Sequence, residues 1–248
     1  MSITVHQFPC LSDNYGFLVR DDATGLAACV DTPEAGPILK ALDELGWKLA
    51  LILNTHWHQD HAGGNAEIKA ATGATVVGPA EVERLTPLDR KVGGGDVVEL
   101  GQTRFQVIET GGHTLGHIAY YDAGDHVAFV GDTLFALGCG RMFEGTADQM
   151  WTSLQRLAAL PDDTRVYCAH EYTASNARFA LSVDDDPALK ARAAEIFAAR
   201  ERGEPTVPTT IGLEKATNPF LRAPLLRPGV AAHEAFGAVR AAKDAFRG

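Results

Sequence analysis

The sequence predicts an α+β protein in which a mixed domain of strands and helices, residues 1–172, is followed by a smaller helical domain, residues 173–248. Up to about residue 172, short apolar or alternating runs are separated by Gly, Asp, Thr and Pro turns, which is typical of strands. Beyond it the chain is rich in alanine and has helical spacing. Hydrophobic residues make up 46% of the 248 residues, enough to fill a core without disulfides.

Strand-length segments account for most of the first domain. They are Ile3–Phe8, Gly16–Arg20, Leu26–Asp31, Leu49–Leu53, Thr75–Val77, Asp96–Leu100, Phe105–Glu109, Ile118–Asp122, His126–Gly131 and Val166–Ala169. Helical spacing predicts helices over Pro37–Leu45 and Ala62–Thr72, which end at Gly46 and Gly73 because glycine readily adopts the left-handed conformation past a helix end. Thr146 and Gln149 form a capping-box pattern ahead of a further helix.

Helices dominate the predicted second domain. The spacing predicts helices over Ala174–Leu181 and Pro187–Arg200, the latter with Asp186 as N-cap. Residues 203–229 carry five prolines and are predicted to form an irregular connector. Val230–Arg247 is predicted to close the chain as an amphipathic helix.

Charge and composition exclude several classes of protein. Lys and Arg total 22 against 32 Asp and Glu, a formal net charge of −10 that argues against nucleic acid as the main partner. No run approaches the roughly 18 apolar residues of a membrane helix, and the start MSITVHQFPC lacks the features of a secretory signal. The four cysteines form no Cys-x-x-Cys pair. We expect a monomer with reduced thiols, located in the cytoplasm.

Metal-ligating side chains follow several predicted strands. His56, His58, Asp60 and His61 come directly after the apolar run Leu49–Leu53. His56 and His58 are two apart in an extended segment, so both project to one face. His113, Asp132 and His170 each follow a later strand. Loops at strand ends are where a rigid sheet presents functional groups.

These residue types favour zinc, iron or manganese, which imidazole and carboxylate ligands suit. Asp beside neutral imidazoles is costly in a core without a cation. Five histidines and two aspartates exceed one tetrahedral site and are enough for two metal ions that share a bridge. We therefore expect two divalent metal ions per chain, with zinc as the first candidate and iron or manganese as alternatives.

The segment Thr55–His61 resembles the Thr-His-x-His-x-Asp-His signature of the metallo-β-lactamase superfamily. Three further segments narrow the resemblance to the glyoxalase II (hydroxyacylglutathione hydrolase) family: Gly138–Ala147, Cys168–Thr173, and Asn218–Arg222 together with the closing helix. The resemblance spans essentially the whole chain. It implies a metallo-β-lactamase αββα sandwich with a helical C-terminal domain that completes a glutathione-binding pocket.

The resemblance also implies roles for single residues. One metal would be held by His56, His58 and His113, and the second by Asp60, His61 and His170. Asp132 would bridge the two metals together with a water or hydroxide. Asp60 and Asp132 are the expected catalytic residues, because Asp60 could also orient the proton of the hydroxide.

Five residues are expected to bind the glutathione part of the substrate by the same resemblance: Arg141, Phe143, Tyr172, Arg240 and Lys243. Phe143 stands where the family often has Tyr, and Arg141 where many members have Lys. Arg240 and Lys243 are three apart on the predicted closing helix and so share a face. Glutathione carries a net charge of about −1 near neutral pH, so an acidic protein needs such local cations to bind it.

The implied activity is hydrolysis of an S-(2-hydroxyacyl)glutathione thioester, first of all S-lactoylglutathione to glutathione and D-lactate, a step of methylglyoxal detoxification. A metal-bridging hydroxide would attack the thioester carbonyl, so no Ser or Cys nucleophile is required. Two alternatives stay open: a glutathione persulfide dioxygenase with a single iron, and a non-catalytic metal-binding module on the same fold. The acidic balance argues against a nuclease.

Overall fold

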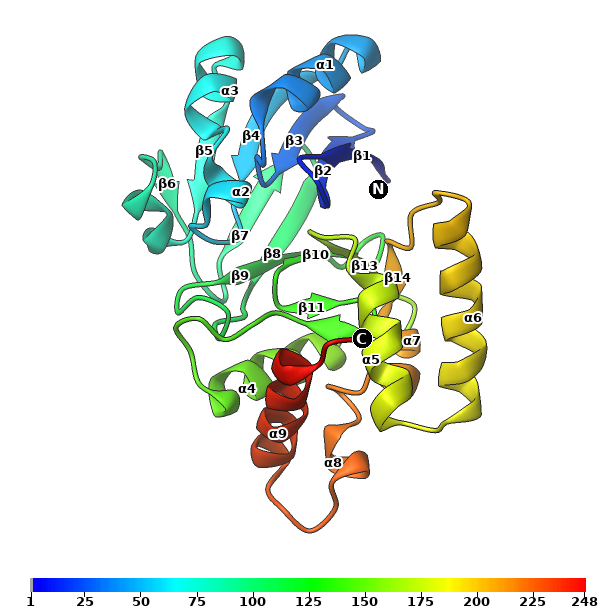
Figure 1. Ribbon diagram of the computed structural model, residues 1–248. Helices are drawn as coiled ribbons and strands as arrows, with labels where there is room; N and C mark the ends of the chain where they lie inside the picture. The colour runs from blue at the N-terminus through cyan, green and yellow to red at the C-terminus, as the bar shows by residue number, and fades with distance from the viewer. Residues whose placement is uncertain (1) are drawn as a thin grey trace. The chain divides into compact units, whose positions relative to one another are not determined.

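The computed structural model describes residues 2–248, which separate into two compact units (Figure 1). Unit 1 comprises residues 2–109 and 116–131, and unit 2 comprises residues 110–115 and 132–248. These units differ from the predicted domains, because residues 132–172 belong with the C-terminal helices in unit 2. The predicted boundary at residue 172 stays a prediction. Among the described residues, no helix combines the length and apolar character needed to cross a membrane.

Unit 1 is built on two layers of strands. The first sheet runs in the order β1 (Ile3–Cys10), β2 (Asn14–Asp21), β3 (Leu26–Val30), β4 (Lys48–Leu53), β5 (Thr75–Gly78) and β6 (Arg90–Lys91). Strands β1 to β3 are antiparallel, whereas β3 to β6 are parallel. The second layer is the antiparallel meander β7 (Val97–Leu100), β8 (Thr103–Glu109), β9 (Ile118–Asp122) and β10 (Val127–Gly131).

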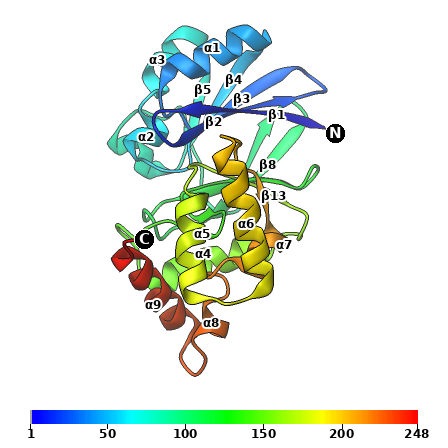
Figure 2. The ribbon, with the colours of Figure 1, turned by 45° about the vertical axis from the view of Figure 1, so that its right-hand side comes forward.

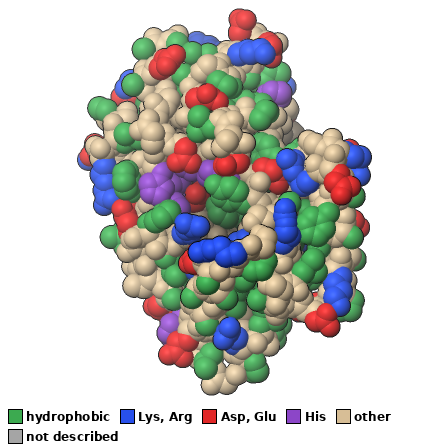
Figure 3. Space-filling model, in the orientation of Figure 1, with side chains coloured by type: hydrophobic (Ala, Val, Ile, Leu, Met, Phe, Trp, Pro, Cys, Tyr) green, Lys and Arg blue, Asp and Glu red, His purple; other side chains and the backbone are tan. Residues whose placement is uncertain are grey.

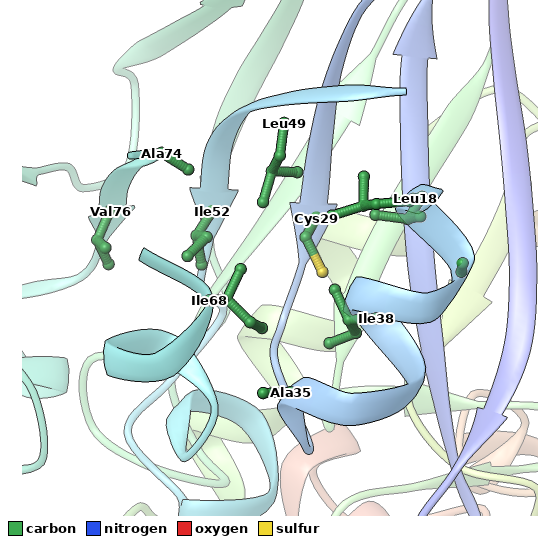
Figure 4. Packing of buried hydrophobic residues seen from close by; sticks show 11 residues of the cluster. Leu18, Cys29, Ala35, Ile38, Leu49, Ile52, Ile68, Ala74 and Val76 are labelled. Atoms are coloured by element: carbon green, nitrogen blue, oxygen red, sulfur yellow. The ribbon is translucent and has the colours of Figure 1, made fainter. Parts of the chain in front are cut away.

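Helices α1 (Ala35–Leu45) and α3 (Asn65–Thr72) lie on the same face of the first sheet (Figures 1 and 2). Figure 4 shows that Ile38 and Ile68 from these helices point toward Cys29 and Ile52 from strands β3 and β4. The opposite face meets the meander, where the ring centroids of Phe17 and Phe129 lie 5.7 Å apart. Unit 1 is thus layered as helix, sheet and sheet. Strands β3 and β10, which are almost wholly buried, are continuous apolar runs.

The predicted helix over Ala62–Thr72 is wrong as a single element. It is split into α2 (Gln59–Ala62) and α3 at Gly63 and Gly64. A Cβ atom on Gly64 would lie 3.1 Å from the Thr32 carbonyl oxygen, and the Gly64 amide donates to that same oxygen. The glycine therefore permits a close backbone approach. Gly46 and Gly73 end their helices in the left-handed conformation as expected, and η1 (Ala80–Arg84) is a further short helix.

Unit 2 consists of short strands and helices. Its elements are β11 (Leu134–Phe135), β12 (Gly138–Cys139), α4 (Ala147–Ala158), β13 (Arg165–Cys168), α5 (Thr173–Val183), α6 (Pro187–Glu201), β14 (Thr209–Thr210), α7 (Ile211–Thr217), α8 (Ala223–Leu226) and α9 (Ala232–Ala245). Helices α5 and α6 lie side by side (Figures 1 and 2) and bury Ala177, Leu189 and Ala193 with Leu137 of the β11–β12 hairpin. Helix α9 packs on α4 and α8.

The helix starts in unit 2 confirm the capping predictions. Thr146 Oγ1 accepts from the Gln149 backbone amide. Gln149 Oε1 accepts in turn from the Thr146 backbone amide, which completes the capping box. Asp186 caps α6 ahead of a proline. The irregular connector predicted over residues 203–229 is wrong, because β14, α7 and α8 lie within it. Pro208 directly precedes β14, and Pro224 lies in the first turn of α8. Thr210 caps α7 by accepting from the Leu213 amide.

Candidate functional site

Unit 1 gathers its four predicted ligands at the end of strand β4. His56 lies in a bend after the strand, His58 has extended backbone, and Asp60 and His61 lie in the single turn of α2. His56 Nε2 is 3.1 Å from His58 Nδ1, and His61 Nε2 is 3.5 Å from Asp60 Oδ2. His56 and His61 are buried, whereas His58 and Asp60 are half-buried. The four side chains therefore present their donor atoms to one small region.

Asp31 is a residue that the sequence analysis did not single out, and it orients two of these ligands. Its Oδ2 accepts from His61 Nδ1 and from the Thr55 hydroxyl, each at 2.8 Å. Because that hydroxyl donates its proton to Asp31, it accepts from His56 Nδ1 at 3.0 Å. Both imidazoles are thereby held with Nδ1 protonated, which leaves Nε2 as the ligating nitrogen.

The backbone explains how Asp31 reaches this position. Strands β3 and β4 are parallel, so their carboxyl ends meet at one edge of the sheet, and the Asp31 amide donates to the Leu53 carbonyl at 2.9 Å. Asp31 has φ +55°, a left-handed conformation that Asp tolerates better than most residues. The only sign of this role in the sequence is that Asp31 is an acidic residue at the end of a predicted strand. Asn14 was also missed: its Nδ2 donates to Asp60 Oδ2 at 3.1 Å.

Unit 2 brings together the other three predicted ligands. Asp132 follows β10, and its Oδ2 and Oδ1 lie 3.4 Å and 3.3 Å from the Nε2 atoms of His113 and His170. His113 Nδ1 donates to the Arg141 carbonyl at 2.8 Å, which again directs Nε2 toward the carboxylate. His170 is stacked on Tyr172, with ring centroids 4.7 Å apart and planes within 2°. One buried carboxylate is thus shared between two imidazoles, an arrangement suited to a bridging ligand.

A pocket of about 440 Å³ is lined by two of these residues, His113 and Asp132, and all of its lining belongs to unit 2. The five predicted substrate-binding residues line it: Arg141, Phe143, Tyr172, Arg240 and Lys243. Phe135, Cys139, Gly140, Ser175 and Asn176 complete the lining with His113 and Asp132. Figure 3 shows basic side chains gathered where the C-terminal end of α9 lies next to α5. A pocket with aromatic walls and several cations suits a small anionic ligand.

Arg240 and Lys243 have different surroundings although both come from α9. Arg240 is 4% exposed; it donates to the Cys139 carbonyl at 2.8 Å and to Asp244 Oδ1 at 2.9 Å. Its Nε has no hydrogen-bond partner among the described residues. Lys243 donates to the Ser175 carbonyl at 3.0 Å and is half-buried. A solvated helix face would hold neither side chain in this way.

Several charges around Lys243 change its acidity. Burial, and then the guanidinium groups of Arg240, Arg178 and Arg141, lower the pKa of the Lys243 ammonium to about 8, with Asp244 opposing them. Desolvation and like charges both disfavour the charged form. An anion placed here would relieve the repulsion, so the cluster favours negatively charged ligands.

The remaining pocket residues lie at its rim and wall. Arg141 is largely exposed, with Nε 3.8 Å from Asp244 Oδ1. Phe143 is 63% exposed and meets the His113 ring edge-on at 5.2 Å. Phe135, which the sequence analysis also missed, contacts the rings of His170 and Tyr172 edge-on. An exposed aromatic ring beside a ligand residue is available to cover bound substrate.

The thiols near the pocket are not nucleophiles. Burial raises the pKa of Cys139 to about 11 and that of Cys168 to about 12, in spite of the Arg240 guanidinium beside Cys139. Both are therefore protonated near neutral pH, and the thiolate is the reactive form. Hydrolysis at this site needs another source of nucleophile.

Comparison with known proteins agrees with these features. A family model described as the metallo-beta-lactamase superfamily matches residues 20–170, and one described as the hydroxyacylglutathione hydrolase C-terminus matches residues 171–246. A protein of Erythrobacter litoralis (strain HTCC2594) named hydroxyacylglutathione hydrolase is 56% identical over 98% of this chain and 100% of its own length.

Two solved structures resemble the chain at lower identity. ETHE1 from Myxococcus xanthus superposes with a TM-score of 0.71 at 30% identity, over 96% of this chain and 90% of its own. TTHA1623 in a di-iron-bound form superposes with a TM-score of 0.64 at 25% identity, over 88% of this chain and 100% of its own.

The predicted fold class is confirmed. The chain belongs to the metallo-β-lactamase superfamily and, within it, to the hydroxyacylglutathione hydrolase family.

Proposed function

We propose that the protein hydrolyses the thioester of S-(2-hydroxyacyl)glutathione, with S-lactoylglutathione as the first candidate substrate and glutathione and D-lactate as products. The pocket of unit 2 is the main support for this proposal, because the cations of α9 line the same cavity as His113 and Asp132. The name of the Erythrobacter relative supports the same activity. Hydroxide adds to the thioester carbonyl carbon, the carbon–sulfur bond breaks, and glutathione leaves as its thiolate.

We further propose that the ligands of the two units converge on two divalent metal ions, with zinc as the first candidate and iron or manganese as alternatives. His56, His58 and His113 would hold one, and Asp60, His61 and His170 the other, with Asp132 between them. The donor set fits such ions, because the Nδ1 atoms of His61 and His113 are engaged and direct Nε2 inward. The di-iron form of TTHA1623 supports a two-metal site.

The metal pair would supply the nucleophile, since divalent metals lower the pKa of bound water to about 7. The residues of the chain do the rest. Asp60, held by Asn14, would orient the proton of the attacking hydroxide. Arg240 and Lys243 would bind a carboxylate of glutathione, and Tyr172, stacked on His170, would pack against the glutathione part of the substrate. Phe143 and Arg141 would close over the peptide from the rim.

A thioester hydrolysis assay on protein of measured metal content tests the proposal. We expect the thioester absorbance of S-lactoylglutathione to fall, the rate to vanish with chelator and to return with added zinc, iron or manganese. Oxygen consumption with a glutathione persulfide would instead identify a single-iron dioxygenase. Metal-loaded protein that binds S-methylglutathione but leaves the thioester intact would identify a non-catalytic binding module.

Asp31→Asn is expected to weaken metal binding about 10- to 100-fold, the usual effect of losing a partner that orients a ligating histidine. Asparagine tolerates the left-handed backbone at this position, so the fold should persist. Competition with a chromogenic chelator measures the metal affinity. Asp21→Asn is the matched control, because Asp21 is equally buried in unit 1 but accepts from Thr24 and Thr103. Equal affinity in the Asp31 variant and wild type would refute the orienting role.

The lowered pKa of Lys243 predicts a pH-dependent KM. Above about pH 8 the free protein loses this charge, so KM for a glutathione thioester should rise with pH. Because a bound carboxylate favours the ammonium form, binding of S-methylglutathione at pH 8 should take up protons, which calorimetry in buffers of different ionisation enthalpy measures. Lys243→Arg keeps the charge and should abolish both effects. A flat KM and no proton uptake in wild type would contradict the assignment.

We propose a cytoplasmic monomer. Cys10, Cys29, Cys139 and Cys168 are all buried and free, which fits a reducing compartment. Size-exclusion chromatography with light scattering measures the oligomeric state. A mass of twice 26.5 kDa would refute the monomer.

A further inference from the structure

The β11–β12 hairpin, residues 134–139, forms part of the substrate pocket. Phe135 and Cys139 line the pocket, and the chain continues directly to Gly140 and Arg141, which line it as well. The hairpin turns through Leu137, which has φ +55°, an uncommon conformation for a residue other than glycine. Such a conformation persists only where the surroundings impose it.

Buried side chains from elsewhere in unit 2 bind the backbone of this hairpin. Asn218 Nδ2 donates to the carbonyls of Phe135 at 3.2 Å and Gly138 at 3.0 Å. Glu214 Oε2 accepts from the Leu137 amide at 2.9 Å. Asn176 Nδ2 donates to the Ala136 carbonyl at 3.1 Å, and Arg240 donates to that of Cys139 at 2.8 Å. Side chains from the α5, α7 and α9 regions thus hold every residue of the hairpin from 135 to 139.

Glu214 and Asn218 are themselves fixed. Arg192 makes a buried ion pair with Glu214 Oε1 and also donates to Thr217 Oγ1 at 2.7 Å. Asn218 Nδ2 also lies 2.8 Å from Glu214 Oε2, and Asn218 Oδ1 accepts from the Phe220 amide at 2.9 Å. Glu214 and Asn218 are 0% exposed. Burying such an ion pair is costly and gives little net stability, which favours a role in positioning.

Movement of the hairpin would reach the substrate-binding groups directly. Phe135 meets Tyr172 edge-on at 5.5 Å and His170 at 5.9 Å. The Cys139 carbonyl is one of the two acceptors, with Asp244 Oδ1, that orient Arg240 in the pocket. A shift of the hairpin therefore displaces one aromatic wall and one cation together.

We propose that Glu214 and Asn218 are positioning residues for substrate binding, which fix the β11–β12 hairpin and through it the aromatic wall and Arg240. This inference rests on the proposed function, since it concerns the pocket that would bind the glutathione thioester. Neither residue touches the pocket, so both act through the hairpin backbone.

Asn218→Ala tests the inference, with Thr103→Val as control. Thr103 is buried in unit 1, where it donates to Asp21 Oδ1 at 2.9 Å, and it belongs neither to the hairpin nor to the side chains that bind it. We expect Asn218→Ala to raise KM for S-lactoylglutathione about tenfold, as for one misaligned charged contact, with kcat within about threefold. Hydrogen exchange by mass spectrometry should speed up over residues 134–141. Thr103→Val should lower Tm but leave KM and this exchange unchanged.

The possible failures can be told apart. If Asn218→Ala does not fold, Asn218→Ser, which keeps a hydroxyl acceptor for Phe220, takes its place. Exchange over residues 134–141 that is equal in wild type and the Asn218 variant would overturn the positioning role, whatever the substrate. An unchanged KM in an active Asn218 variant would do the same. A wild-type protein that neither hydrolyses the thioester nor binds S-methylglutathione would refute the proposed function, while exchange still tests the hairpin.

Discussion

Asp132→Ala is expected to remove bound metal and thioester hydrolysis together. Each carboxylate oxygen of Asp132 faces a different histidine Nε2, at 3.3 Å and 3.4 Å. Without the carboxylate, His113 and His170 lose the group between them, and the proposed metal pair loses its bridge. Loss of an outer partner of a metal ligand costs about 10- to 100-fold, so loss of this ligand should cost at least about 100-fold in activity.

Metal analysis after desalting and initial rates on the same sample measure this effect. Asp122→Ala is the matched control: Asp122 is as buried as Asp132 but lies in unit 1, where it accepts from the amides of Gly124 and Asp125. The control should keep its metal and its kcat. An Asp132 variant that retains full metal content with wild-type activity would exclude Asp132 from the centre.

Arg240→Ala combined with Lys243→Ala should raise KM for the glutathione thioester while the metal is retained. A charge-assisted hydrogen bond contributes about 1.5–3 kcal/mol, so loss of two should raise KM about 100-fold or more. A change in KM with little change in kcat identifies lost ground-state binding. Steady-state kinetics over a wide substrate range, with metal content measured in parallel, separate the two parameters.

The two substitutions differ in their side effects. Arg240 also binds the Cys139 carbonyl, so its loss disturbs the hairpin, whereas Lys243 interacts with Ser175 at the pocket edge. Lys243→Ala alone should therefore give a clean increase in KM of about tenfold. Arg247→Ala removes one positive charge just beyond α9 and serves as control. A double variant with wild-type KM would mean that glutathione binds elsewhere.

The strands and helix ends were predictable because local signals determine them. Apolar runs of strand length predicted β4 and β9, and the pair Thr146 and Gln149 predicted the start of α4. The break between α2 and α3 was missed, because it depends on the approach of Gly64 to the Thr32 carbonyl, a contact between distant segments. Helices α7 and α8 were missed because the prolines near their ends were interpreted as signs of irregular structure.

The ligand types were readable from the sequence, but the residues that orient them were not. His-x-His-x-Asp-His after a strand is a local pattern, whereas Asp31 reaches His61 only because β3 and β4 run parallel and end together. Glu214 and Asn218 likewise reach the hairpin only through the packing of unit 2. Partners of this kind have no spacing rule, since tertiary structure alone brings them together.

We propose that hydrolysis depends on a pair of metal ions whose ligands come from both units. Stepwise return of zinc to chelator-treated protein, with S-lactoylglutathione turnover measured at each step, tests it most directly. We expect no turnover without metal and a rise that ends at about two ions per chain. Full turnover by protein without zinc, iron or manganese, or a plateau at a single ion, would contradict the account.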